Sequence, residues 1–206
     1  MARKITVYFS LLSPWAYIGH AELLGLVAKH GLHVVWRPVA LGQVFPESGG
    51  LPLSKRHPSR QRYRIVELQR WREKRGLDFH LHPQFWPFDP SLADRVVCAM
   101  TEAGADAAKF IAAAFAGIFE QQRNLADPTT IAAILDECGA GAHWLERGQS
   151  GAAEVEYQRN LALALGEGVF GSPSYLLDGE VFWGQDRLDL LDDALTSGRK
   201  SFSADA

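Results

Sequence analysis

The chain has 206 residues, of which 47% are hydrophobic and 22% are charged, and its formal net charge is −3 at pH 7. This composition is typical of one globular domain, or of one domain that carries a large insertion. The mild negative charge argues against a nucleic-acid binder, and no apolar run approaches the ~18 residues of a membrane-spanning helix. The N-terminus lacks the apolar core of a signal peptide, so we expect a cytoplasmic protein.

The first elements are a strand and a helix separated by a short turn. Residues 4–10 are rich in β-branched and aromatic side chains and predict a strand. Ser13 is a good N-cap and Pro14 a good first helical residue. The helix should end at about His30, with Gly31 as its C-cap.

A second strand is predicted over residues 32–41 and should end near Pro38. Residues 42–57 carry Gly, Pro and Ser and predict a loop. The patterns are then helical for more than 100 residues, with helices expected over 58–75, 90–103, 105–123, 128–138 and 150–166.

The chain closes with two short strands and a helix. Apolar runs at 173–179 and 180–184 surround an Asp-Gly pair, which is a strong signal for a β-hairpin. Residues 186–198 predict an amphipathic helix. The order is therefore β-α-β, a block of helices, and β-β-α.

This order is the thioredoxin arrangement, and a large helical insertion between its halves is the variant of DsbA-type proteins. We therefore expect an α/β fold. Residues 1–45 and 168–206 should form a discontinuous thioredoxin-like domain, and residues 46–167 should form the helical insertion.

The turn before the first helix reads Ser13-Pro14-Trp15-Ala16, at the position where this fold often carries Cys-x-x-Cys. Disulfide exchange needs a thiolate and usually a second, resolving thiol, and this turn has neither. Cys98 and Cys138 are 40 residues apart within helical patterns, which indicates buried free thiols and no disulfide framework.

Within this superfamily, the sequence resembles the 2-hydroxychromene-2-carboxylate isomerases and the related kappa-class glutathione transferases. The resemblance covers nearly the whole chain and is carried by "YFSLLSPWAYIG", "RYRIVELQRWREKRGL" and "GVFGSPSYLLDGEVFWGQDRL". It implies a glutathione-binding enzyme, usually a homodimer, with a serine at the head of the first helix. It also implies a cis peptide bond before Pro173.

The serine at the head of the helix is Ser13. A hydroxyl and the positive end of a helix can both stabilise a thiolate, so this turn can hold the sulfur of bound glutathione although it lacks a cysteine. The alternative is that Ser13 is only an N-cap.

Three further residues have a role that the resemblance implies. The backbone of Ser172 would pair with the cysteinyl part of glutathione like an added strand. Gln185 and Asp186 stand where related proteins hold the γ-glutamyl end, and an aspartate can pair with the ammonium there. The alternatives are a plain turn at Ser172 and a helix cap at Asp186.

Residues 55–75 contain nine Lys or Arg and two Glu, a local charge of +7 in a chain whose net charge is −3. Most of these charges are expected to form a solvated helix face. One or two could bind the glycine carboxylate of glutathione or an anionic substrate. Alignment with the family favours Arg60, three residues before Tyr63, where the family residue is commonly lysine; Lys55 is the second candidate.

The segment 82–88, "HPQFWPF", is aromatic and rich in proline. Its Trp86 could wall a pocket for a flat aromatic substrate, or the segment could be a connector that packs against the helices. His80 and His82 have no nearby ligand partner, so no metal site is expected.

The sequence thus predicts a glutathione-dependent cis-trans isomerase of 2-hydroxychromene-2-carboxylate, or of a similar aromatic breakdown intermediate. The enzyme would bind glutathione and a small aromatic substrate, and neither nucleic acid nor membrane. One alternative is a kappa-class-like transferase or peroxidase that acts on other electrophiles. Another is a non-catalytic thioredoxin-like binding module.

Overall fold

The computed structural model describes residues 3–204 and contains one mixed sheet in the order β2-β1-β3-β4. Its strands are β1 (Lys4–Phe9), β2 (His33–Pro38), β3 (Ser174–Leu177) and β4 (Glu180–Trp183). β1 is parallel to β2 and antiparallel to β3, and β3 is antiparallel to β4. The predicted thioredoxin-like order is therefore confirmed. Residues 1–2 and 205–206 of the predicted domain lie outside the described residues.

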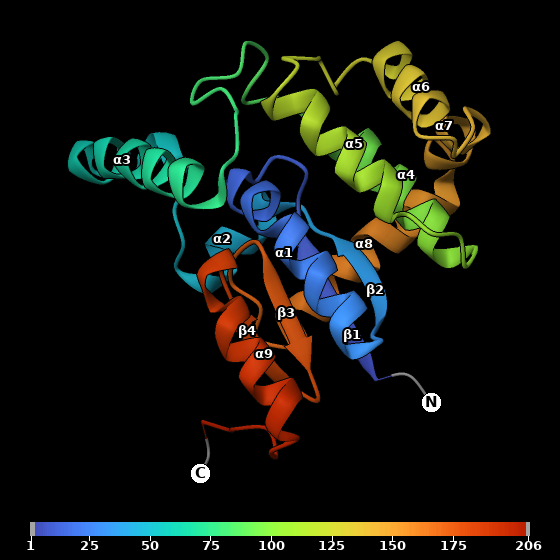
Figure 1. Ribbon diagram of the computed structural model, residues 1–206. Helices are drawn as coiled ribbons and strands as arrows, with labels where there is room; N and C mark the ends of the chain where they lie inside the picture. Colours follow the sequence, from blue (N-terminus) through green and yellow to red (C-terminus); the bar gives the residue numbers. More distant parts are fainter. Residues whose placement is uncertain (1–2, 205–206) are drawn as a thin grey trace.

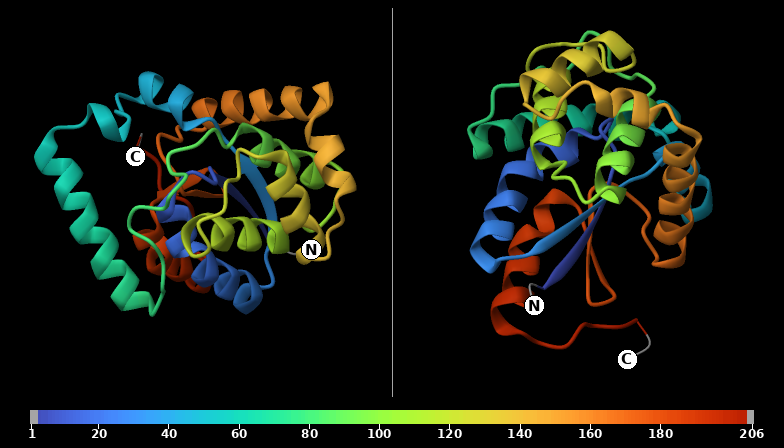
Figure 2. Two further views of the ribbon diagram at one scale, coloured as in Figure 1. Left: turned by 90° about the horizontal axis from the view of Figure 1, so that it is seen from above. Right: turned by 90° about the vertical axis from the view of Figure 1, so that its right-hand side faces the viewer.

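Helices cover both faces of this sheet (Figures 1 and 2). α1 (Pro14–His30) and α9 (Leu188–Ser197) lie on one face, and α2 (Leu41–Ser48) and α8 (Gly151–Gly166) lie on the other. β1 is central, and five of its six residues are buried. This explains why it reads as a nearly continuous apolar run without the alternation of a half-exposed strand.

Five further helices precede α8 within the predicted insertion 46–167: α3 (Pro58–Arg75), α4 (Ser91–Glu102), α5 (Ala108–Phe119), α6 (Pro128–Glu137) and α7 (His143–Gly148). α4 to α7 gather at one end of the sheet, whereas α3 extends to the other side as an arm (Figure 1). Phe9 of β1 packs against Trp36 of β2 and Phe115 of α5, with ring centroids 5.8 and 6.2 Å apart. The insertion therefore shares the hydrophobic core of the sheet. Among residues 3–204, no helix is both long and apolar enough to cross a membrane.

Three short helices, α2, η1 and α7, were not expected from the sequence. The predicted loop 42–57 is wrong in part, because it contains α2 and the short 3-10 helix η1 (Leu53–Lys55). α2 forms despite its internal proline because Val44 is buried in a cluster with Tyr8 and Ala164. α7 is likewise stabilised by burial, because Trp144 packs into the hydrophobic core.

Two predicted helices have different bounds. The helix expected over 105–123 is shorter, and Gln122 beyond its end has a positive φ of 54°. The helix expected over 186–198 is divided into the 3-10 turn η2 (Gln185–Arg187) and α9. Side chains near this division therefore lie in a tight turn at the sheet edge.

Candidate active site

Ser13 lies at the start of α1, in the loop that follows β1. Its Oγ accepts a hydrogen bond from the backbone N–H of Ala16 at 3.3 Å, and Pro14 occupies the first turn, so the predicted N-cap is confirmed. The same hydroxyl donates to the backbone carbonyl of Ser172 at 3.2 Å. Ser13 therefore makes a long-range contact that a helix cap does not require.

The peptide bond between Ser172 and Pro173 is cis, as the family resemblance implied. The Oγ of Ser172 accepts a hydrogen bond from the N–H of Ser10 at 3.2 Å. The Pro173 carbonyl accepts one from the N–H of Gly184 at 2.9 Å. Together with the contact from Ser13, these bonds join three distant segments of the chain beside the start of α1.

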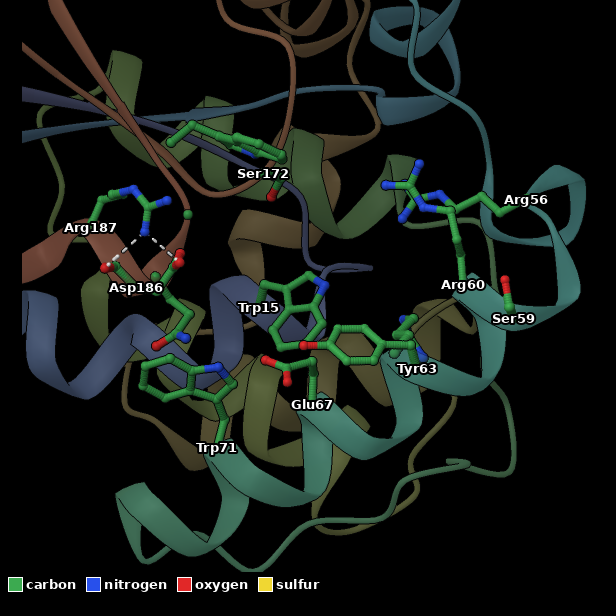
Figure 3. A pocket seen from close by; sticks show the side chains of 14 residues that line it. Trp15, Arg56, Ser59, Arg60, Tyr63, Glu67, Trp71, Ser172, Asp186 and Arg187 are labelled. Atoms are coloured by element: carbon green, nitrogen blue, oxygen red, sulfur yellow. Dashed lines mark hydrogen bonds and ion pairs between the residues drawn. The ribbon is translucent and has the colours of Figure 1, made fainter.

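A pocket of about 680 Å³ opens next to this junction (Figure 3). Its walls come from Trp15 in the first turn of α1, from one face of α3 and the turn before it, and from Ser172 and residues 183–187. Figure 3 shows Trp15 in the middle, with Arg60 on one side and Asp186 on the other. Charged groups at the two sides are thus separated by an aromatic surface.

Four of the residues that the sequence proposed for the site line this pocket: Arg60, Ser172, Gln185 and Asp186. Ser13 does not line it directly. With only 4% of its surface exposed, it lies behind Ser172, which its hydroxyl contacts. The structure therefore brings five of the proposed residues to one place.

Lys55 and Trp86, the other two candidates, do not line the pocket. Lys55 ends η1 with an exposed side chain, and its neighbour Arg56 faces the pocket in its place. Trp86 is half-buried, and its indole N–H donates to the carbonyl of Leu12 at 2.9 Å. This packing corresponds to the connector interpretation of segment 82–88, although Trp86 also contacts a lining residue, Arg64.

The turn from β4 into η2 places Gln185 and Asp186 on the pocket wall. Gly184 has a φ of +102°, which glycine adopts without strain. Gln185 is buried, and its Oε1 accepts a hydrogen bond from Arg75 at 3.3 Å. Asp186 accepts from Arg187 at 2.6 Å, and α9 begins at Leu188, with Arg187 in the N-cap position and no side-chain cap. The alternative interpretation of Asp186 as a helix cap is therefore wrong.

Sequence reasoning missed most of the residues that α3 contributes. Two rows of residues spaced by four face the pocket from α3: Arg60 and Arg64, and beside them Tyr63, Glu67 and Trp71. Arg56, in the turn before α3, also lines the pocket. Residues four apart share one face of a helix. This spacing is the signal that could have identified them, but the sequence favours a solvated face for most of the charges.

A buried carboxyl lies behind the loop that carries Ser13. Asp94 of α4 is fully buried and accepts hydrogen bonds from the N–H of Leu11 at 3.2 Å, the hydroxyl of Tyr157 at 3.1 Å and the hydroxyl of Ser10 at 3.4 Å. Burial raises the pKa of Asp94 from 3.8 to about 7. No local pattern in the sequence indicates this buried carboxyl, which ties the insertion to the loop just before Ser13.

The fold and site can be compared with known proteins. A family model described as a DSBA-like thioredoxin domain matches residues 4–196, so the chain belongs to this family. It is 27% identical to a 2-hydroxychromene-2-carboxylate isomerase of Sphingobium xenophagum, over 95% of this chain and 99% of the relative. It is 28% identical to a protein of the same name from Pseudomonas putida, over 93% of this chain and 93% of the relative. A solved 2-hydroxychromene-2-carboxylate isomerase has a TM-score of 0.80 and 25% identity, covering 94% of this chain and 95% of that one.

Proposed function

We propose that the protein is a glutathione-dependent cis-trans isomerase of 2-hydroxychromene-2-carboxylate or of a similar intermediate of aromatic breakdown. Relatives of nearly the same length that carry this name support the reaction. The observation that carries the proposal is the Ser13 hydroxyl at the start of α1, 3.2 Å from the carbonyl of Ser172 beside the cis proline. The turn from Ser13 to Ala16 has no cysteine, so thiol chemistry there depends on a thiol from a ligand.

The groups around the pocket fit glutathione, which has an ammonium at its γ-glutamyl end, a thiol in the middle and a carboxylate at its glycine end. The carboxylate of Asp186 can pair with the ammonium, with Gln185 beside it, and Arg60 can pair with the glycine carboxylate. Asp186 and Arg60 lie on opposite sides of the pocket (Figure 3). The backbone of Ser172, on the wall, can pair with the cysteinyl part.

Bound glutathione would supply a thiolate that adds to the conjugated double bond, permits rotation about the resulting single bond and is then eliminated. Ser13 would stabilise that thiolate by rotating its hydroxyl hydrogen from the Ser172 carbonyl toward the sulfur. The positive end of α1 favours the same charge and lowers the pKa of a thiol placed there.

A calorimetric titration with glutathione, followed by a spectroscopic isomerase assay, tests the proposal. Glutathione should bind one equivalent per chain, and the isomerisation rate should saturate with glutathione. S-methylglutathione is the control, because it should bind without supporting turnover. Failure to bind glutathione would leave a non-catalytic binding module, whereas binding with conjugation of other electrophiles and no isomerisation would favour a transferase.

A further inference from the structure

The acidic residues on the pocket wall are already paired. Glu67 forms an ion pair with Arg70 on the same helix, and Asp186 forms one with Arg187. Neither carboxylate is paired with the row of arginines on the other side of the pocket. These pairs lower the acidic character of the pocket and leave that row uncompensated.

The row consists of Arg56, Arg60 and Arg64, which all line the pocket. No carboxylate within residues 3–204 lies at ion-pair distance from any of the three. Burial lowers the pKa of Arg64 to about 10, and the charge of Arg56 contributes. Arg56 and Arg64 are partly removed from water, and Arg60 is exposed beside them. Three like charges this close together attract anions strongly.

In the proposed function, the glycine carboxylate of glutathione pairs with Arg60 and neutralises one of the three charges. Of the other two, Arg56 already donates from Nε to the carbonyl of Leu51 at 2.8 Å. The guanidinium of Arg64 has no hydrogen bond to any described residue, so its donors are available for a ligand. Arg64 is therefore the better candidate for a second anion.

Arg64 is also held in a defined place. Its guanidinium carbon lies over the Trp86 ring, 4.9 Å from the ring centre, in a cation–π contact. The indole N–H of Trp86 donates to the carbonyl of Leu12 at 2.9 Å, and Leu12 directly precedes Ser13. An anion bound by Arg64 is therefore positioned relative to the loop that carries the proposed thiolate-binding hydroxyl.

We propose that Arg64 binds the carboxylate of the aromatic electrophile, and that Trp86 is a positioning residue that orients Arg64. This inference rests on the proposed function and adds to it the residue that selects the second substrate. The enzyme accordingly prefers electrophiles with a carboxylate near the reactive double bond over neutral ones. A planar guanidinium suits this task because it can form two parallel hydrogen bonds to a carboxylate.

The test compares Arg64→Met with Arg62→Met, a control that removes an exposed arginine of the same helix outside the pocket. With 2-hydroxychromene-2-carboxylate, Arg64→Met should raise KM by about 10- to 100-fold, the factor for a lost charged hydrogen bond. Its glutathione affinity, and its conjugation rate with neutral 1-chloro-2,4-dinitrobenzene, should stay within about twofold of wild type. Arg62→Met should change none of these. An unchanged KM, or equal losses with both electrophiles, would overturn the proposal.

The role of Trp86 is tested by a double-mutant cycle. Trp86→Leu should raise KM for the carboxylate substrate but by less than Arg64→Met, and the double variant should be no worse than Arg64→Met alone. If the increases in KM of the two single variants multiplied in the double variant, Trp86 would act independently of Arg64.

Direct binding separates failure of this inference from failure of the proposed function. If the wild type shows no glutathione-dependent turnover, coumarin-3-carboxylate and its uncharged methyl ester can be titrated by calorimetry. Tighter binding of the acid than of the ester, lost in Arg64→Met and kept in Arg62→Met, supports the carboxylate subsite even without isomerase activity. Equal binding of acid and ester, or no binding of the acid, overturns it.

Discussion

Ser13 uses both hydrogen-bonding capacities of its hydroxyl, accepting from Ala16 and donating to the Ser172 carbonyl. Ser13→Ala removes the donor proposed for the thiolate, so the thiol pKa of bound glutathione should rise by ~1–2 units. Turnover at neutral pH should then fall about ten- to a hundredfold, and the loss should shrink as pH rises because the thiol ionises unaided. Ultraviolet titration of the bound thiolate and a pH–rate profile measure both effects.

Ser150 is a matched control for Ser13. It caps α8 by accepting from the N–H of Ala153 at 3.3 Å, and it does not line the pocket. Ser150→Ala and Ser13→Ala should each lose about 1 kcal/mol of unfolding free energy, but only Ser13→Ala should shift the thiolate pKa. Identical thiolate pKa values in wild type and Ser13→Ala would reduce Ser13 to a helix cap.

The Asp186 side chain should contribute to glutathione binding and very little to the stability of the folded protein. Its ion pair with Arg187 is about half exposed on both sides, with 45% and 49% of the side chains accessible, and such pairs contribute ~0–1 kcal/mol. Asp186→Ala should weaken glutathione binding by ~1.5–3 kcal/mol with a nearly unchanged melting temperature. Calorimetry and thermal unfolding measure the two quantities, with Asp189→Ala, one turn away and outside the pocket, as control. Unaltered affinity would remove Asp186 from the site.

Asp94 should make stability depend on pH. The unfolded chain releases this proton near pH 3.8 and the folded protein near pH 7, so between these values the folded state binds more protons and stability falls as pH rises. From pH 5 up to the folded pKa the difference covers about two pKa units, which correspond to roughly 3 kcal/mol. Urea unfolding at pH 5 and pH 8 should therefore show a loss for wild type that is much smaller in Asp94→Asn. Equal losses in both proteins would show that Asp94 is ionised throughout this range.

At the scale of elements, α1 and η2 approach so closely at Gly19 that a side chain has no room. A Cβ there would lie 2.6 Å from the Cβ of Gln185. Gly19→Ala should therefore cost ~1–3 kcal/mol through overpacking and weaken glutathione binding by displacing Gln185. Denaturant unfolding and calorimetry measure both.

Gly25 provides the comparison on the same helix, because a Cβ there meets nothing within 4 Å. Gly25→Ala should stabilise the protein by up to about 1 kcal/mol through helix propensity and leave glutathione affinity unchanged. If Gly19→Ala behaved like Gly25→Ala, the contact between α1 and η2 would not control the position of Gln185.

At the scale of the whole molecule, the insertion and the sheet share one core, and the two cysteines lie in α4 and at the end of α6, not in the turn before α1. Cys98 is buried and accepts from the side chain of Asn160 at 3.4 Å, and burial raises its thiol pKa far above its ordinary value. We expect no reduction of insulin disulfides above background, with thioredoxin as the positive control. Turnover in this assay would contradict the glutathione mechanism.

The homodimer implied by the family resemblance stays a prediction that sedimentation equilibrium can test.

Much of the fold could be predicted from the sequence because its signals are local. The cap at Ser13 needs only an amide three residues away. The hairpin turn needs two residues that accept positive φ, and Asp178 and Gly179 adopt 51° and 86°. α2 could not be predicted in this way, because burial of Val44 against Tyr8 outweighs the local effect of a proline.

The sequence by itself therefore determined the β-α-β and β-β-α order of the thioredoxin-like elements, the absence of a redox pair in the turn and, through the family resemblance, five residues that gather at one place. Only the tertiary structure decided that Arg64 faces the pocket, that Trp86 lies behind it and that Asp94 is buried beside the loop of Ser13. The physical reason is distance along the chain. Caps and turns depend on neighbours within a few residues, whereas burial, charge balance and pKa at a site are set by groups that only folding brings together.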